Sequence, residues 1–224
     1  MPITARRSSV RPAAGPTDVS LDDLSPMLLD EVPRAFSDPA WTFEIKFDGY
    51  RVLAAADRSG VRLKSRNGAD ATGWFPEVAQ ALQAVASRRL IVDGEVCVLD
   101  DLGRSDFDRL HARARRRAYD PSEPVVYCVF DTLAAGGKSV ISQPLLARKK
   151  FLAALRDLPN ILVVDHIPGE GEAFYRHAVE LKLEGLVGKR LDAPYQPGIR
   201  SRDWVKIKRP GAVPAKRFDR SGTR

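Results

Sequence analysis

The chain has 224 residues, of which 44% are hydrophobic and 29% are charged, as is typical of a protein with one sizeable buried core. No stretch reaches the roughly 20 apolar residues of a membrane helix, and the N-terminus lacks the apolar core of a signal peptide. The two cysteines, Cys97 and Cys128, exclude a disulfide framework and a zinc finger. We therefore expect a cytoplasmic monomer without membrane contact, in which both thiols are inert packing groups.

Positive charge is concentrated at one end of the chain. The net charge is +7, and residues 200–224 contain nine Lys and Arg side chains against two Asp. A neutral body with one basic end suggests a polyanionic partner such as nucleic acid. A solvated tail in an Arg-rich protein has the same composition, so charge alone does not decide between the two interpretations.

The periodic part of the sequence is flanked by two basic segments. Residues 1–20 are rich in Arg, Ser, Pro and Ala without any period, which predicts a flexible N-terminal segment. Residues 21–209 carry the alternating and helical patterns of one folded domain. A basic C-terminal tail follows over 210–224.

The domain mixes short strands with helices. Residues 41–57 alternate as a strand that Gly49 interrupts, and residues 61–67 are predicted to form the second strand of a hairpin. Further strands are predicted over 90–100, 125–133, 185–190 and 203–209, and apolar spacing predicts helices over 75–85, 145–158 and 172–183. Because these elements follow no strict strand–helix–strand order, the predicted fold class is α+β with antiparallel sheets.

Charged residues occur inside several of these strands. Glu44, Lys46 and Asp48 share one face of the first strand, because side chains alternate across a strand. Gly94 separates two carboxylates within residues 90–100, and a glycine weakens a strand unless something must approach its backbone closely. Only ten residues are Lys against 26 Arg, and four of the ten lie in apolar strands, where long charges are costly. A single Lys between carboxylates is usually a solvated charge, but this repetition indicates a binding or catalytic role.

Six short motifs occur in order along the chain. They are KFDGYR at 46–51, SRNG at 65–68, DGE at 93–95, FD at 130–131, EGLVGKR at 184–190 and WVKIK at 204–208. Together they resemble the motifs of the ATP-dependent DNA ligases, which belong to the covalent nucleotidyltransferase superfamily with the RNA ligases and mRNA capping enzymes. The segments 24–28, 106–110 and 195–198 are most similar to the ligase module of bacterial non-homologous end-joining ligases. The resemblance covers residues 24–210.

The resemblance implies a nucleotidyltransferase (adenylation) fold, in which two antiparallel sheets flanked by helices surround a central ATP cleft. In ligases of this type an OB-fold domain follows, but only sixteen residues follow Lys208, too few for its five strands. We therefore expect no C-terminal OB-fold in this chain, so that a separate OB-fold or clamp partner, or the basic tail, would help to hold DNA. An end-joining role would add a DNA-end-binding protein as a partner.

The resemblance also implies roles for individual residues. Lys46 would attack the α-phosphate of ATP to form lysyl-AMP, with nearby cations favouring its neutral amine. Mg²⁺ or Mn²⁺ would be held by Glu95 and Glu184, because hard cations prefer carboxylate oxygens. The other implied ATP contacts are Glu44 and Phe130 on the adenine, Glu95 on the ribose, Arg66 on the ribose or a phosphate, and Ile45, Arg51, Lys189, Lys206 and Lys208 elsewhere around the nucleotide and its phosphates.

Three features have simpler alternatives. Phe130 could be an ordinary core residue, and on a regular strand it cannot face a ligand together with Asp131, because consecutive side chains point to opposite faces. Trp204 is expected in the core rather than as a stacking platform. Residues 104–117 contain six Arg against two Asp, and they could contact the phosphate backbone of DNA or form a solvated helix.

The sequence therefore predicts the adenylation domain of an ATP-dependent DNA ligase, which forms lysyl-AMP, transfers AMP to a DNA 5′-phosphate and seals breaks in repair. Two alternatives stay open at this point. One is an RNA ligase of the same superfamily, and the other is a non-catalytic module that binds nucleotide or DNA ends and needs a partner OB-fold.

Overall fold

The computed structural model describes residues 19–116 and 122–212 of the chain. Within these ranges no helix is long and apolar enough to cross a membrane. The predicted flexible segment over 1–20 and the basic tail over 210–224 lie almost entirely outside the described residues, so the statements about them stay predictions.

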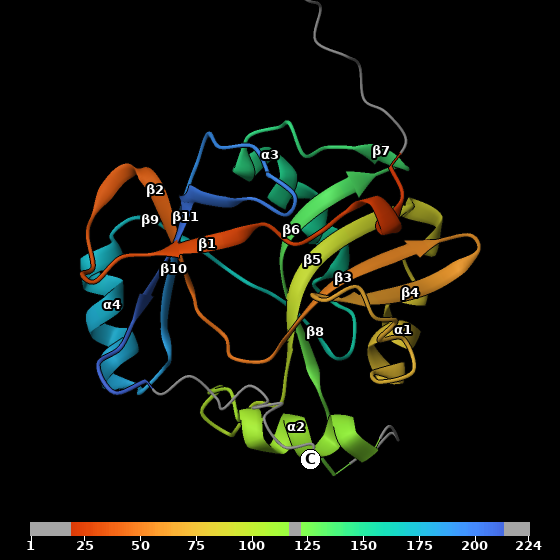
Figure 1. Cartoon of the computed structure of the whole chain (residues 1–224), viewed down its shortest axis with the longest axis horizontal. Coiled ribbons are helices and arrows are strands. Elements are labelled where there is room, and N and C mark those ends of the chain that lie inside the picture. The colour runs from red at the N-terminus through yellow and green to blue at the C-terminus, as the bar shows by residue number, and fades with distance from the viewer. Residues whose placement is uncertain (1–18, 117–121, 213–224) are drawn as a thin grey trace, which may run out of the picture.

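Two β-sheets form the centre of the molecule (Figure 1). One contains, in spatial order, β1 (Leu28–Glu31), β11 (Arg200–Lys208), β10 (Gly185–Arg190), β2 (Asp38–Ile45) and β9 (Ile167–Gly169). The other contains β4 (Gly60–Ser65), β3 (Tyr50–Asp57), β5 (Leu90–Cys97), β6 (Val126–Ala135) and β7 (Lys138–Ser139), with β8 (Ile161–Val163) also paired to β6. Neighbouring strands are antiparallel as predicted, except that β1–β11 and β6–β8 are parallel pairs.

Helices cover the sheets from outside. Those packed on a sheet are α1 (Pro76–Gln83) on β3 and β4, α3 (Leu145–Lys149) on β6, and α4 (Gly171–Glu180) on β2 and β10. At the bottom of Figure 1, α2 (Phe107–Arg116) lies across the end of the second sheet. The 3₁₀ helices are η1 (Leu21–Asp23), η2 (Ala86–Arg88) and η3 (Lys150–Leu155).

Two predicted elements differ from the observed ones. The predicted strand over 41–57 is divided between β2 and β3, which belong to different sheets. The predicted helix over 145–158 is α-helical only to Lys149 and continues as the 3₁₀ helix η3. Leu152 and Leu155 are both fully buried, and a spacing of three residues fits a 3₁₀ helix as well as an α-helix.

A buried apolar cluster joins the two sheets. It contains Trp204 of β11 together with Leu53 of β3, Ile91 of β5 and Leu133 of β6. Trp204 is only 1% exposed, which confirms its predicted place in the core. Because strands alternate, the neighbours of these residues point away from the cluster, and Val52 for example packs on the opposite face with α1. Residues at odd positions of β3 and β5 therefore face the space between the sheets.

Candidate active site

The loop over 46–49 connects β2 of one sheet to β3 of the other. The backbone N–H of Lys46 donates to the carbonyl oxygen of Gly185 at 3.0 Å, which ties the loop to the start of β10. At its other end, Gly49 lies so close to β5 that an added Cβ would be 2.1 Å from the carbonyl oxygen of Val96. Only glycine fits at this position, and the loop is fixed against both sheets.

The side chain of Lys46 is held by a carboxylate. Its Nζ lies 2.6 Å from Glu184 Oε2, and the two side chains are 16% and 17% exposed. Ile45 pairs with Leu186 across β2 and β10, and this register places Glu184 beside Lys46. Burial raises the pKa of the Glu184 carboxyl above its ordinary value, although the charge of Lys46 opposes the shift. Glu184 therefore accepts a proton more readily than an exposed glutamate would.

A cavity of about 160 Å³ lies beside this ion pair. It is lined by Ile45, by the Asp48 carboxylate and by three further cations, Arg104, Lys182 and Arg209. An amine, two carboxylates and several cations thus surround one small space. Cations of this kind bind phosphate oxygens, and carboxylates bind hard metal ions.

The segment that leads into α2 contacts the loop from a third side. Ser105 Oγ accepts a hydrogen bond of 3.1 Å from the backbone N–H of Asp48. The Tyr50 hydroxyl and His111 Nδ1 are 2.7 Å apart, and the Tyr50 ring meets the Phe107 ring edge-on with centroids 5.7 Å apart. The position of the loop therefore depends on α2 as well as on both sheets.

The arginines of this segment are not all available to DNA. Arg113 is fully buried and its Nη2 lies 2.8 Å from Glu77 Oε1. Arg104 pairs with Asp100 at 2.7 Å. Arg109 pairs with Glu123 at 3.3 Å. The predicted phosphate contact over 104–117 is therefore wrong for Arg113, and two more of its cations are already neutralised.

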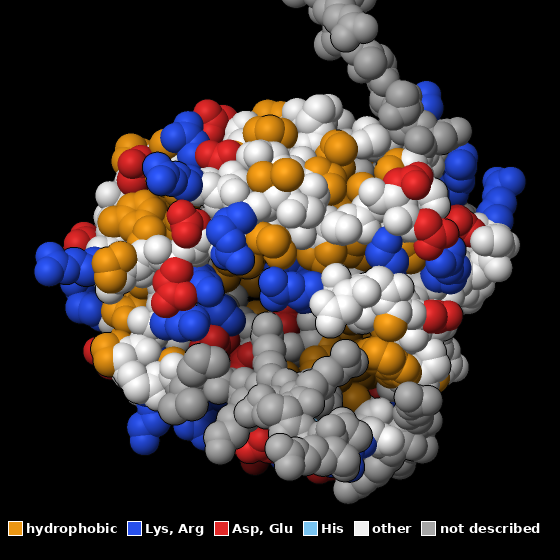
Figure 2. Space-filling view, in the orientation of Figure 1, with side chains coloured by type: hydrophobic (Ala, Val, Ile, Leu, Met, Phe, Trp, Pro, Cys, Tyr) orange, Lys and Arg blue, Asp and Glu red, His pale blue; other side chains and the backbone are white. Residues whose placement is uncertain are grey.

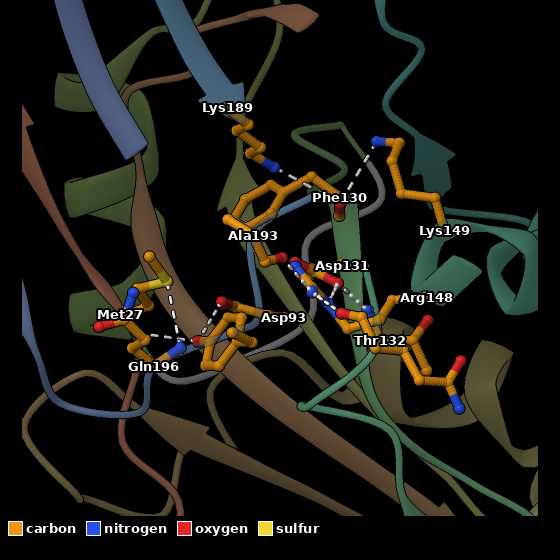
Figure 3. A network of polar contacts seen from close by, with 12 residues as sticks. Met27, Asp93, Phe130, Asp131, Thr132, Arg148, Lys149, Lys189, Ala193 and Gln196 are labelled. Carbon is orange, nitrogen blue, oxygen red and sulfur yellow. Dashed lines mark hydrogen bonds and ion pairs between the residues drawn. The ribbon is translucent and has the colours of Figure 1, made fainter. Parts of the chain in front are cut away.

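Glu44 lies at the centre of a buried triad of charges. Its Oε1 is 2.7 Å from Lys149 Nζ and its Oε2 is 2.6 Å from Lys189 Nζ, with all three side chains at most 7% exposed. The two lysines outweigh the effect of burial and lower the pKa of Glu44 below its ordinary value. Because the two lysines share this one carboxylate, its attraction does not offset the cost of burying the charge of Lys189. Burial therefore lowers the pKa of Lys189 to about 8. Figure 3 shows Lys149 and Lys189 approaching the backbone of Phe130 from two sides.

Phe130 occupies an irregular position in β6. Asp93 of β5 pairs with Asp131, but the next residue of β5, Gly94, pairs with Val129, so Phe130 is an extra residue in the ladder. Such a bulge reorients a side chain and leaves its backbone free for other partners. The Phe130 carbonyl accepts hydrogen bonds from Lys149 Nζ at 3.3 Å and Lys189 Nζ at 3.5 Å. The regular alternation assumed from the sequence does not hold at this residue.

The ring of Phe130 lies among cations. The Arg51 guanidinium carbon is 4.6 Å and Lys189 Nζ is 4.4 Å from the ring centroid, which are cation–π distances. Trp204 meets the same ring edge-on at 6.1 Å. Phe130 is thus half-buried between the sheets, and its predicted stacking on adenine stays a prediction.

Arg51 is held by a buried carboxylate. Its Nε and Nη2 lie 2.6 and 2.7 Å from the two oxygens of Asp93, which is fully buried. The Tyr195 hydroxyl donates to the same carboxylate at 2.6 Å and accepts from the backbone N–H of Met27 at 2.8 Å. The close approach expected at Gly94 is also present, because an added Cβ would be 2.5 Å from the Tyr127 ring.

Lys206 and Lys208 lie on one face of β11, as their spacing predicts. Val205 and Ile207 are buried on the opposite face. The two lysines share Glu31 of β1, at 2.9 and 3.7 Å. Arg51, Lys206 and Lys208, which were predicted around the nucleotide and its phosphates, are thus paired with carboxylates other than Glu184.

The two remaining predicted contacts lie on the second sheet. Glu95 of β5 is half-buried and pairs across the ladder with Arg51 of β3. Arg66 is exposed in the turn after β4, where its backbone N–H donates to the carbonyl oxygen of Arg51 at 3.0 Å. Neither side chain lines the cavity beside Lys46. Their predicted nucleotide contacts, and the predicted metal contact of Glu95, stay predictions.

Three participants in the site were not predicted from the sequence. Lys149 binds Glu44 from 105 residues away, and no motif surrounds it. Arg148 is fully buried against Asp131 with both nitrogen–oxygen distances below 3 Å. Tyr195 lies in a segment that the family resemblance included, but nothing in the sequence pairs it with Asp93. For Arg148 and Lys149, the only sequence feature that indicated a role was the run of adjacent cations at 148–150 within an otherwise apolar segment.

A divalent metal fits the cavity beside Lys46. Glu184 and Asp48 both line it, and across residues 19–116 and 122–212 no cluster of three or more metal-binding side chains exists. Mg²⁺ keeps several water molecules and uses one or two protein carboxylates together with substrate phosphates. Two carboxylates therefore suit Mg²⁺, and they do not suit a cation that needs all its ligands from protein side chains.

Comparison with known proteins identifies the family of the chain. The family model described as ATP dependent DNA ligase domain matches residues 26–208. The chain is 36% identical over 188 residues to the multifunctional non-homologous end joining protein LigD of Mycolicibacterium smegmatis, covering 84% of this chain and 24% of that protein. It is 34% identical over 187 residues to the SPbeta prophage-derived DNA ligase-like protein LigB of Bacillus subtilis, covering 82% and 67%.

Solved structures of DNA ligases are also similar to the chain. A mycobacterial DNA ligase D complexed with ATP and MES has a TM-score of 0.75 and 32% identity, covering 85% of this chain and 62% of that one. The ligase domain of Mycobacterium tuberculosis LigD has a TM-score of 0.74 and 31% identity over the same shares. The chain spans about a quarter of the length of the LigD proteins that it matches.

Proposed function

Because the chain belongs to the family of ATP-dependent DNA ligase domains, we propose that it uses Lys46 to take AMP from ATP and transfers that AMP to a DNA 5′-phosphate during break repair. The observation that carries the proposal is the Lys46–Glu184 pair at 2.6 Å, half enclosed beside a small cavity rich in cations. A lysine amine that must lose a proton and meet a phosphorus atom needs such surroundings.

In the first step the Lys46 nitrogen forms a bond to the α-phosphorus, and the bond from that phosphorus to the bridging oxygen of pyrophosphate breaks. The ammonium proton must leave before the attack, and the Glu184 oxygen at 2.6 Å is the nearest acceptor. Asp48, and Glu184 once it has passed that proton to solvent, would hold Mg²⁺, which neutralises phosphate oxygens when bound.

In the second step an oxygen of the DNA 5′-phosphate attacks the same phosphorus and Lys46 leaves. In the third, a 3′-hydroxyl attacks the activated 5′-phosphate, AMP leaves and the strand is joined. Lys206 and Lys208 lie on the strand beside Glu184, where they can offset the charge that moves in these steps. Phe130 and Glu44 would bind the adenine in the space between the sheets.

The decisive experiment uses ATP labelled at the α-phosphate, with Mg²⁺ or Mn²⁺. We expect the full chain to become labelled covalently, Lys46→Ala to stay unlabelled, and Lys138→Ala, an exposed lysine on β7, to label as the wild type does. Labelled protein is then mixed with nicked DNA duplexes and, separately, with nicked RNA duplexes, which distinguishes DNA joining from RNA joining. If the wild type never becomes labelled, with or without a partner OB-fold protein, the proposed AMP transfer is refuted and the non-catalytic alternative is favoured.

A further inference from the structure

Within the described part of the chain, two cations beside Lys46 have no carboxylate partner. Lys46 pairs with Glu184 and Arg104 pairs with Asp100. Lys182 and Arg209 line the same cavity but form no ion pair with any described residue. Cations that line one cavity without an ion-pair partner of their own repel each other, and a bound anion relieves that repulsion.

Arg209 is positioned by the backbone and not by a carboxylate. It directly follows β11, and its backbone N–H donates to the carbonyl oxygen of Glu184 at 2.9 Å. Its Nε donates to the carbonyl oxygen of Leu183 at 3.0 Å and its Nη1 donates to that of Pro210 at 3.2 Å. A guanidinium carries five N–H donors, so this half-buried fork is fixed beside Glu184 with donors left over for a ligand.

Lys182 occupies a backbone conformation that favours glycine. It follows the end of α4 with φ of 57°, where a residue with a Cβ is strained by roughly 1–2 kcal/mol. Its backbone N–H closes the helix on the carbonyl oxygen of Val179 at 3.0 Å, a role that glycine fulfils better. The position therefore holds an exposed cation beside the cavity at some cost to the fold.

Building on the proposed function, we infer that Lys182 and Arg209 form a phosphate-binding subsite on the outer side of Lys46. Its ligand is a phosphate group that the reaction brings there, either the pyrophosphate leaving group of ATP or the 5′-phosphate of the DNA strand. Both carry oxygens that match an Arg fork and a Lys ammonium. Removing one charge-assisted hydrogen bond from such a subsite weakens binding by about tenfold or more.

Lys182→Gly separates binding from stability. The substitution removes the cation and relieves the backbone strain, so we expect the melting temperature to rise by about 2–4 °C while phosphate binding weakens about tenfold. Arg209→Gln is the second variant, with Arg209→Lys as the conservative form that keeps the charge. Arg58→Gln, an exposed cation in the turn between β3 and β4, is the control that loses the same charge away from the cavity.

Two assays on the full chain distinguish the sources of the phosphate. In the first, labelled lysyl-AMP protein is titrated with inorganic pyrophosphate and the return of ATP is measured. In the second, the same protein is bound to nicked duplexes with a 5′-phosphate or a 5′-hydroxyl. A tenfold higher half-saturating pyrophosphate concentration in both variants supports the leaving-group source, and loss of the preference for the 5′-phosphate supports the DNA source.

Different results would overturn the phosphate-binding subsite and the lysyl-AMP reaction. If the wild type forms lysyl-AMP but both variants match it and Arg58→Gln in both assays, the subsite is refuted and the proposed function stands. If the wild type forms no lysyl-AMP, calorimetry with pyrophosphate on the unmodified proteins decides the inference alone. Equal pyrophosphate affinity in the wild type, Lys182→Gly and Arg209→Gln would then overturn it.

Discussion

Asp93 is the carboxylate on which the position of Arg51 depends. It is fully buried, it meets the guanidinium through two contacts below 3 Å, and Tyr195 donates to it as well. Removing one partner of a buried ion pair leaves the other charge without compensation, which costs about 3–5 kcal/mol.

We therefore expect Asp93→Asn to lower the free energy of unfolding by about 3–5 kcal/mol, measured by urea denaturation at neutral pH. Asp22→Asn is the matched control, because the Asp22–Arg62 pair has both side chains more than half exposed and should contribute at most about 1 kcal/mol. An equal decrease in the free energy of unfolding of the two variants would show that the buried pair stabilises the fold no more than the exposed pair does.

Lys189 links stability to alkaline pH. Burial lowers its pKa from 10.5 to about 8 in the folded chain. Below pH 8 the lysine is charged in both states, and between pH 8 and 10.5 the unfolded chain holds the proton that the folded chain has released. The free energy of unfolding must then rise with pH in this window.

We expect the wild type to gain up to about 3 kcal/mol relative to Lys189→Met between pH 8 and 10.5. The measurement is urea denaturation of both proteins at several pH values. In Lys189→Met the carboxylate of Glu44 keeps Lys149 as its partner, so the variant controls for the titrating groups outside this triad. Parallel curves for the two proteins would contradict the shifted pKa.

Single residues of the site could be predicted from the sequence only where a motif surrounds them. Lys46 and Glu184 belong to two motifs, and the structure brings them within 2.6 Å. Lys149 belongs to none, and its contact with Glu44 spans 105 residues. Contacts of this range depend on how whole elements pack, which no local pattern contains.

At the scale of elements, α2 and the segment before it support the loop that carries Lys46. Ser105 accepts the backbone N–H of Asp48 through a part-buried hydrogen bond. Without that acceptor the loop has one fewer anchor, although the buried core is untouched. The effect should fall on the placement of the nucleophile and hardly on the fold.

We expect Ser105→Ala to slow AMP transfer from ATP by about two- to tenfold, corresponding to one hydrogen bond of about 0.5–1.5 kcal/mol. The rate at saturating ATP should fall more than the Michaelis constant rises, and the melting temperature should change little. Ser59→Ala, in the turn between β3 and β4, serves as control. A large loss of stability in Ser105→Ala, with an unchanged rate, would refute the positioning role.

Regular elements were predictable and irregular ones were not. β10 occupies residues 185–190 as expected, since a short apolar run is bounded by a glycine and by charged residues. The bulge at Phe130 was missed because its apolar surroundings look the same whether the ladder is regular or not. The 3₁₀ helix η3 was missed because Leu152 and Leu155 fit either helical period.

At the scale of the whole molecule, the two sheets are joined through the cluster around Trp204. This side chain lies between β11 and the second sheet and is 1% exposed. Figure 2 shows Lys and Arg side chains gathered with a few carboxylates across the middle of one face of the molecule. A loss of packing here should loosen both sheets together, because neither covers its inner face alone.

We expect Trp204→Ala to lower the free energy of unfolding by about 3–5 kcal/mol and to speed hydrogen exchange in both β3 and β10. Trp204→Phe should cost less, because it keeps an aromatic ring, and the indole Nε1 has no hydrogen-bond partner in the part of the chain described. Faster exchange in β10 only would show that the two sheets are stabilised independently.

The parallel pairing of β1 with β11 sets an order on folding during translation. Strands β3 to β6 lie within residues 50–135, so their sheet can assemble while the ribosome is still adding later residues. β1 must wait for residues 200–208 before it gains its only neighbour among the described strands of the sheet. Until then both edges of β1 are unpaired, and an unpaired strand edge is where a nascent chain forms wrong pairs.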